Sequence, residues 1–112
     1  MPYLKLLNSK YSIILYRWLS MNYNQYEHYS NKGGRRAEQV ENYRNPSISV
    51  KELRTITDTV NEYKEFWNFE NRVLKKGIEE INAHTSFNVS YEKIKKGRSI
   101  DSIVFHIEKK RK

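Results

Sequence analysis

The sequence has 112 residues, enough for one hydrophobic core, so we expect a single domain over residues 1–112. Lys and Arg number 21 against 13 Asp and Glu, and the resulting net charge of +8 favours a polyanionic partner. The absence of cysteine excludes a disulfide scaffold, a cysteine-based zinc finger, an iron–sulfur site and a thiol nucleophile. No apolar run approaches the ~20 residues of a membrane span and no signal-peptide pattern opens the chain, so we expect a cytoplasmic protein without membrane contact.

The first predicted element is a helix over residues 4–21. Apolar residues recur there every three or four positions, which is the period of a helix with one buried stripe. Asn8 or Ser9 is expected to cap its main part, and Trp18 is expected to lie in the core. The stripe consists of Leu4, Leu7, Tyr11, Ile14, Leu15, Trp18 and Leu19.

Residues 22–46 interrupt this pattern and form a polar, tyrosine-rich insertion. Its middle reads Lys32-Gly33-Gly34-Arg35-Arg36. Because Gly-Gly is a turn signal, we expect a hairpin tip or a mobile loop here.

A short edge strand at residues 47–49 and a short helix are predicted next. Ser49-Val50-Lys51-Glu52 fits a capping box, in which the serine hydroxyl accepts a backbone N–H at the start of a helix. The helix should end near residue 58. Thr59-Val60-Asn61-Glu62 fits a second box, which predicts that another helix begins at residue 59.

That second helix, predicted over residues 59–84, has the strongest periodicity in the chain. Gly77 interrupts it, and we interpret this glycine as a point of close packing rather than a break. One side of the helix is apolar, with Phe66, Phe69, Val73, Leu74, Ile78 and Ile81, and the other carries Lys64, Asn68, Asn71, Arg72, Lys75 and Glu79.

The C-terminal part predicts an antiparallel hairpin. Apolar and polar residues alternate over 87–92 and again over 102–107, which is the period of a half-buried strand. A basic turn at residues 95–98 joins them. Residues 92–112 hold eight basic and three acidic residues, so five of the eight net positive charges lie in this part of the chain.

These elements together predict an α+β winged helix-turn-helix: three helices and a C-terminal antiparallel β-hairpin wing, with the polar insertion after the first helix. In such a domain the second helix of the pair enters the major groove and the wing lies on phosphates. Arginine suits guanine edges and asparagine adenine edges, whereas phosphates need only well-placed cations. The predicted base-reading residues are Lys64, Trp67, Asn68, Asn71, Arg72 and Lys75, and the predicted phosphate contacts are Lys10, Arg54, Lys95, Lys96 and Arg98.

Four blocks of the sequence resemble iteron-binding plasmid replication initiators, in that family's order. Residues 9–16 (SKYSIILY) are similar to the opening helix of its second winged-helix domain, and residues 49–54 (SVKELR) to the short helix. Residues 69–82 (FENRVLKKGIEEIN) resemble the recognition helix, and residues 94–100 (IKKGRSI) the wing turn. The combined pattern is most similar to theta-type initiators of lactococcal and related Gram-positive plasmids.

The resemblance implies a role in starting plasmid replication. Such initiators carry two winged-helix domains, bind direct repeats called iterons at the origin, help to melt an AT-rich region and recruit host initiator and helicase. Many also repress their own promoter as dimers. This chain would be the C-terminal part, and its partner would be the N-terminal winged-helix domain, which is associated with dimerisation. The insertion over residues 22–46 departs from many members in its length.

Two other classes of function compete with this interpretation. A rolling-circle nickase needs closely spaced histidines to hold its metal, whereas His28, His84 and His106 are far apart in sequence. We therefore expect no enzyme activity, no cofactor and no metal site. A transcriptional repressor, a protein-interaction module or an RNA-binding module remains open, and so does an ordinary solvated surface on the helix. Against a base-stacking sheet, the exposed strand positions are not aromatic: Asn88, Ser90, Ser102 and His106.

Overall fold

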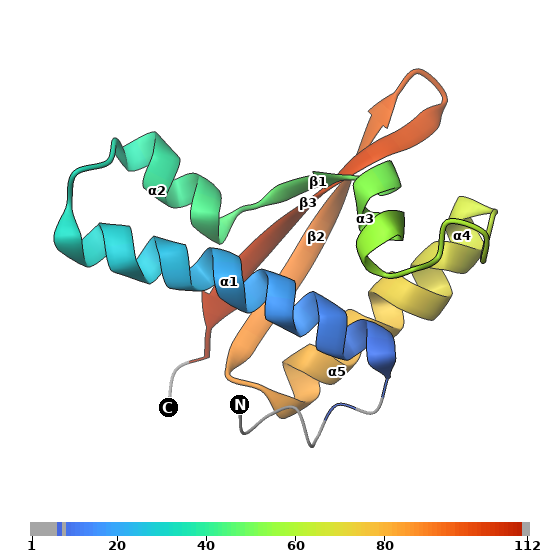
Figure 1. Ribbon diagram of the computed structural model, residues 1–112, viewed down its shortest axis with the longest axis horizontal. Coiled ribbons are helices and arrows are strands. Elements are labelled where there is room, and N and C mark those ends of the chain that lie inside the picture. Colours follow the sequence, from blue (N-terminus) through green and yellow to red (C-terminus); the bar gives the residue numbers. More distant parts are fainter. Residues whose placement is uncertain (1–6, 8, 111–112) are drawn as a thin grey trace.

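The computed structural model describes residue 7 and residues 9–110, and Figure 1 shows their arrangement. Helices lie on both sides of a short first strand, and the two long strands form a hairpin that extends past the helices (Figure 1). In chain order the elements are α1 (Lys10–Lys32), α2 (Ala37–Arg44), β1 (Ser47–Ser49), α3 (Val50–Ile56), α4 (Phe66–Phe69), the π-helical η2 (Glu70–Lys75), α5 (Lys76–His84), β2 (Phe87–Lys96) and β3 (Ser99–Lys109).

The first helix is capped by Ser9, as expected, but it ends at Lys32 rather than near residue 21. The Ser9 hydroxyl accepts the Tyr11 N–H at 3.1 Å. Leu7 is buried but precedes the helix, and Leu4 lies outside the described residues. The helix continues because aromatic rings extend its apolar stripe: Tyr23 is buried and its ring lies 5.3 Å from that of Phe87.

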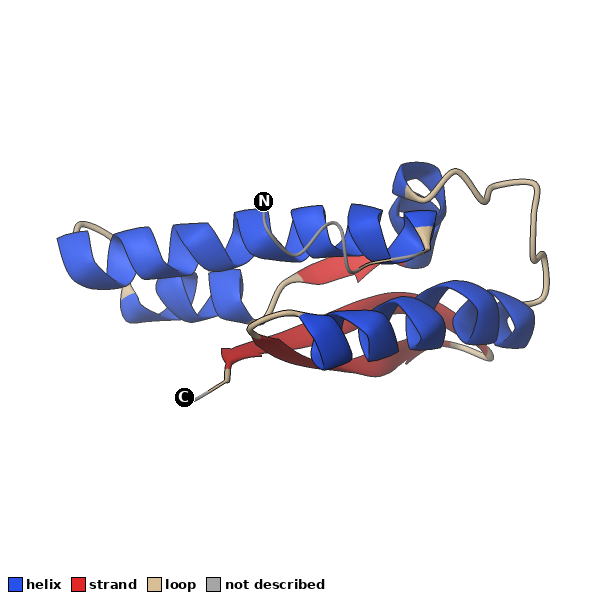
Figure 2. Cartoon of the chain, turned by 90° about the horizontal axis from the view of Figure 1, so that it is seen from below, coloured by secondary structure: helices blue, strands red, loops and turns tan. Residues whose placement is uncertain are grey.

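The expected loop at residues 22–46 is instead a helical arm, formed by the second half of α1 and by α2 (residues 22–44). The turn at Gly33 and Gly34 is where the sequence places it, with positive φ angles of 77° and 84°. The two helices lie side by side (Figures 1 and 2), and the rings of Tyr29 and Tyr43 stack with centroids 5.7 Å apart. Polar tyrosine-rich sequence therefore forms helix here because its rings pack against one another.

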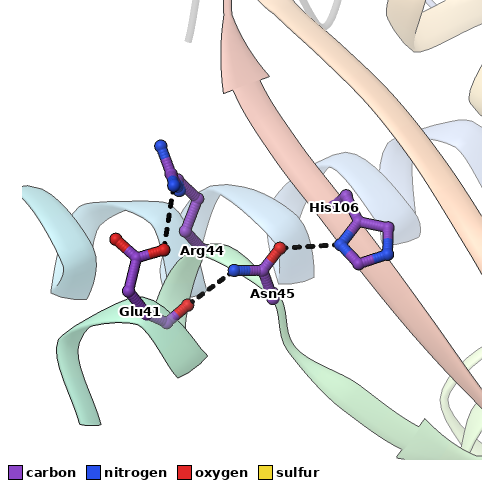
Figure 3. A network of polar contacts seen from close by, with 4 residues as sticks. All are labelled: Glu41, Arg44, Asn45 and His106. Atoms are coloured by element: carbon purple, nitrogen blue, oxygen red, sulfur yellow. Dashed lines mark hydrogen bonds and ion pairs between the residues drawn. The ribbon is translucent and has the colours of Figure 1, made fainter. Parts of the chain in front are cut away.

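Polar contacts fasten the base of this arm to the sheet (Figure 3). Asn45 donates from Nδ2 to the Glu41 carbonyl at 3.0 Å, so its Oδ1 is free to meet His106 Nδ1 at 2.7 Å. Arg44 and Glu41 form an ion pair at 2.8 Å. The arm is thus joined to β3, the central strand.

The short strand and short helix follow the predictions. β1 pairs antiparallel with β3, and the Ser49 hydroxyl accepts the Glu52 N–H at 3.0 Å at the start of α3. The prediction that a second capping box begins a helix at Thr59 is wrong, because residues 59–65 form a loop. The Thr59 hydroxyl is buried and bonds to that of Thr57 at 2.9 Å instead of capping a helix.

Consecutive elements α4, η2 and α5 form one composite helix (residues 66–84), which begins seven residues later than predicted. Its apolar side is buried, and Gly77 is a close-packing point as expected. A Cβ atom on Gly77 would lie 2.8 Å from Leu15 Cδ1 and 3.6 Å from Ser12 Cα, so a larger residue here would have to displace the buried Leu15 side chain of α1. Trp18 of α1 packs edge-on against Phe105 of the sheet, with ring centroids 5.6 Å apart.

The sheet has the order β1-β3-β2 and is antiparallel throughout. The predicted alternation is confirmed, since Val89, Ile103, Phe105 and Ile107 are buried. The strands run further than residues 87–92 and 102–107 and meet at a two-residue turn, where Gly97 has a φ of 67°. A bulge between Ile94 and Lys95 interrupts the ladder just before this turn. The wing is therefore long enough to project beyond the core (Figure 1).

Candidate nucleic-acid interface

An open hollow lies on the exposed side of the composite helix. It brings together five of the six predicted base-reading residues. The sixth, Lys64, is exposed in the loop that precedes the helix. The hollow is lined by Trp67, Asn68, Asn71, Arg72, Lys75, Lys76 and Glu79.

These lining residues fall into two rows with a spacing of four, and the π-helical segment keeps the rows straight. In an α-helix a step of four residues passes a full turn by about 40°, so such a row winds around the helix. The wider i→i+5 turns of η2 reduce this drift over residues 70–75. Consequently Trp67, Asn71, Lys75 and Glu79 share one side of the rod instead of spiralling away from each other.

The polar groups in this hollow are available to a ligand. Within residues 9–110, no side chain of Asn68, Asn71 or Arg72 has a hydrogen-bond or ion-pair partner in the chain. Trp67 is 65% exposed, which is unusual for a large ring and is typical of a contact surface. An unpaired amide or guanidinium can form two parallel hydrogen bonds with a base edge.

The wing tip (residues 95–98) is the second exposed basic surface. Lys95, Lys96 and Arg98 are all exposed, and within the described part of the chain none of them forms an ion pair. Lys93, one step down the strand, differs because its Nζ lies 3.2 Å from Glu70 Oε1. The three predicted wing cations are thus free for phosphates.

Arg54, one of the predicted phosphate contacts, is bound to the backbone of the chain itself. Its guanidinium donates to the carbonyls of Thr59, Glu62, Tyr63 and Lys64 at 2.9–3.2 Å. It also lies 4.5 Å from the centre of the Phe69 ring. Burial lowers the pKa of Arg54 from its usual value. This arginine therefore holds the loop before the composite helix in shape, and its donors are turned inward.

Lys10 lies at the start of α1, close to the composite helix. A smaller hollow, lined by Ser9, Tyr11, Tyr63, Arg72, Lys76 and Glu80, joins this end of α1 to the helix. The link is fixed by Glu80, whose Oε1 accepts from the Ser12 hydroxyl at 2.7 Å and from the Ser9 N–H at 3.2 Å. Lys10 itself is exposed, with its Nζ 5.1 Å from the centre of the Tyr11 ring.

One residue of the interface, Lys76, and one residue that supports it, Asn82, are absent from the sequence-based prediction. Lys76 lines both hollows, and its spacing of four from Arg72 was the signal that could have identified it. Asn82 fastens the end of the composite helix to β2: its Oδ1 accepts the Val89 N–H at 2.7 Å and its Nδ2 donates to the Val89 carbonyl at 2.9 Å. No local pattern identifies Asn82, because its partner lies on another element.

Within the part of the chain that the structure describes, no group of His, Asp or Glu side chains could hold a metal ion. No described helix combines the length and the apolar composition needed to cross a membrane.

Comparisons with known proteins agree with this geometry. Residues 49–107, more than half of the chain, match the family model described as initiator Rep protein, WH2. A solved structure described as Pi initiator protein in complex with iteron DNA is similar, with a TM-score of 0.66 and 26% sequence identity. The match covers 88% of this chain but only 38% of that one. No curated protein matches the sequence significantly. The matched region begins at the last residue of β1 and contains α3, the composite helix and most of the wing, so the chain belongs to the family of initiator Rep proteins and has the fold of their second winged-helix domain.

Proposed function

We propose that the chain binds duplex DNA in a sequence-specific manner, with the composite helix in the major groove. The observation that carries this proposal is the row of unpaired polar side chains along the exposed side of that helix, in a domain of the Rep family. A major groove about 12 Å wide admits one α-helix. The related Pi initiator was solved with iteron DNA, which supports the same class of ligand here.

The residues divide into two groups by their chemistry. Asn68, Asn71 and Arg72 contact base edges, and Lys75 and Lys64 lie alongside them. The flat ring of Trp67 lies against sugar and backbone near the start of the helix. Lys10 and the three wing-tip cations bind phosphates, which hold the helix in register without reading sequence. Arg54 supports this surface from inside and touches no nucleic acid.

The biological target is a set of direct repeats at a plasmid origin, and the consequence of binding is initiation of plasmid replication. On this proposal residues 1–112 are the C-terminal part of a larger initiator of the lactococcal theta type. The chain spans 38% of the length of the Pi chain that it matches, which leaves room for an N-terminal winged-helix domain in a longer protein. Host initiator and helicase would be recruited by the complete assembly in the cytoplasm.

Selection of bound sequences from a random duplex pool tests this function, followed by gel shifts with the selected duplex and a scrambled one. We expect clear preference for the selected duplex at moderate ionic strength, and weaker binding to single-stranded DNA and to RNA of the same sequence. Tighter binding to RNA or single strands would favour the RNA-binding alternative. Preference for a promoter sequence over tandem repeats would favour a repressor, and nicking of supercoiled origin DNA with Mg²⁺ would reveal an enzyme.

A further inference from the structure

Glu70 stands out because it is the only acidic residue between Phe66 and Lys75 on a helix that we expect to lie against DNA. It does not belong to the exposed hollow. Its side chain is only 13% exposed and lies on the flank of the composite helix that meets the sheet. A buried carboxylate is costly unless its oxygens have partners, so its contacts indicate why it is there.

Both carboxylate oxygens bind the wing. Oε2 accepts a hydrogen bond from the Tyr91 hydroxyl at 2.7 Å, and Oε1 accepts one from Lys93 Nζ at 3.2 Å. Tyr91 and Lys93 are two residues apart on β2, so their side chains project from the same face of the strand. One residue of the helix thus contacts two successive positions of the wing.

The donor and acceptor roles in the hydrogen bond between Tyr91 and Glu70 are fixed at neutral pH. Burial works against ionisation of Glu70, but the hydrogen bonds from Tyr91 and Lys93 and the nearby positive charges outweigh it and lower the pKa of Glu70. Burial and the Glu70 carboxylate raise the pKa of Tyr91. Glu70 therefore always accepts and Tyr91 always donates at neutral pH.

The contact sits between the two surfaces that the proposed function requires. Asn71 and Arg72 follow Glu70 directly on the helix, and Lys95 and Lys96 follow Lys93 after the bulge. Base edges and phosphates of one duplex have a fixed spacing, so both sets of side chains engage together only if the helix and the wing are held at one angle. The hairpin extends past the helices (Figure 1), and the Glu70 contacts with Tyr91 and Lys93 lie nearer to its tip than the contacts of Asn82 with Val89.

Resting on the function proposed above, we infer that Glu70 is a positioning residue: through Tyr91 and Lys93 it sets the wing against the base-reading side of the helix, and so determines sequence discrimination more than general affinity for DNA. The rival explanation is that this contact only stabilises the fold. The two differ in which quantity a variant changes.

The test uses the 112-residue chain with Tyr91→Phe and Glu70→Gln, and with Glu41→Gln as matched control. Tyr91→Phe removes one hydroxyl without altering charge, and Glu70→Gln keeps an acceptor but loses the ion pair with Lys93. The control neutralises the carboxylate that pairs with Arg44 on the arm. Each protein is titrated with the duplex that the wild-type chain selects from a random pool and with a scrambled duplex, and its melting temperature is recorded.

We expect Tyr91→Phe to lower the ratio of the two affinities about fivefold, the effect of one hydrogen bond, while binding to the scrambled duplex changes by less than about twofold. Glu70→Gln should lower the ratio less and tighten binding to both duplexes slightly, because one negative charge near the phosphates is gone. The control should change neither. Unchanged ratios in both variants, with or without a lower melting temperature, would overturn the inference. A wild-type chain without any preference would overturn the proposed function itself.

Discussion

Two arginines of this domain show that the surroundings of a residue decide its role. Arg54 and Arg72 carry the same guanidinium group, and both were expected to contact DNA. The two terminal nitrogens of Arg54 donate to four backbone carbonyls, whereas Arg72 has no partner among the described residues and lines both hollows. Substitutions at the two positions should therefore affect different measured quantities.

Removal of a base-reading side chain should weaken specific binding without unfolding the protein. We expect Arg72→Ala or Asn71→Ala to cost ~1–3 kcal/mol on the selected duplex and to relax its sequence preference. Both residues are exposed, so the melting temperature should stay near that of the wild type. Gel shifts on the selected and scrambled duplexes measure the effect, with Lys32→Ala, a cation at the far end of α1, as control. Equal loss on both duplexes would contradict a base-reading role.

Arg54→Lys should instead destabilise the fold. A lysine cannot span four carbonyls, and the carbonyls left without donors cost about 2–3 kcal/mol in free energy of unfolding. Thermal or urea unfolding measures this loss, and Arg44→Lys, which retains an exposed ion pair, should change stability by less than ~0.5 kcal/mol. If Arg54→Lys kept full stability and the charge-removing Arg54→Gln reduced the salt dependence of DNA binding, Arg54 would be a phosphate contact after all.

At the scale of elements, the spacing of apolar residues predicts helices and strands well where buried side chains recur at regular intervals along the chain. The hairpin strands, the short edge strand, the Ser49 cap and the buried side of the composite helix follow from patterns within a few residues. The start of the composite helix does not. The second capping box at Thr59 is locally sound, but Arg54 binds the backbone carbonyls of the same segment and holds it out of helical form. Such side-chain contacts override the local preference for a helix, and the residues of the segment itself do not indicate them.

The helical arm was missed for a related reason. Most residues of the segment 22–46 are polar, but Tyr23, Tyr26 and Tyr29 recur every three residues and pack their rings against neighbours. The Gly33-Gly34 turn was correctly predicted because it depends only on local backbone conformation. One of the contacts that join the arm to the sheet, between Asn45 and His106, connects residues 61 positions apart, so no local sequence pattern predicts it.

The wing should act as a unit that holds phosphates. We expect the double substitution Lys95→Ala and Lys96→Ala to weaken all duplexes by similar factors, because phosphates are the same in every sequence. The slope of log affinity against log salt should fall by about one unit per lost contact. Gel shifts over a series of salt concentrations measure this slope. Lys109→Ala is the matched control, since Lys109 lies at the opposite end of β3 and pairs with Glu27. A loss confined to the selected duplex would mean that the tip reads bases.

At the scale of the whole molecule, the basic charge is uneven, because five of the eight net positive charges lie in residues 92–112. Arg44 on the arm and Lys109 at the C-terminal end of β3 form ion pairs with Glu41 and Glu27, whereas the other arm cations, Lys32, Arg35 and Arg36, are exposed and form no ion pair in the described part of the chain. The cations of the wing tip and of the composite helix face solvent without such partners in the described part of the chain. Under the proposed function, the net charge of +8 attracts DNA in general, while the unpaired groups of the composite helix and the wing tip select where the duplex docks.

A chain with one such surface should bind one repeat as a monomer. The composite helix and the wing belong to a single copy, and the N-terminal domain of the proposed longer initiator would add a second set of contacts. On DNA with two repeats we expect two copies to bind with equal and independent affinity, and the affinity should be lower than that of a longer initiator with both domains, because linked contacts raise effective concentration. Sedimentation of the chain with one-repeat and two-repeat duplexes counts the bound copies. A stoichiometry of two per repeat would contradict the monomer and would place a protein contact on a face that the DNA leaves open.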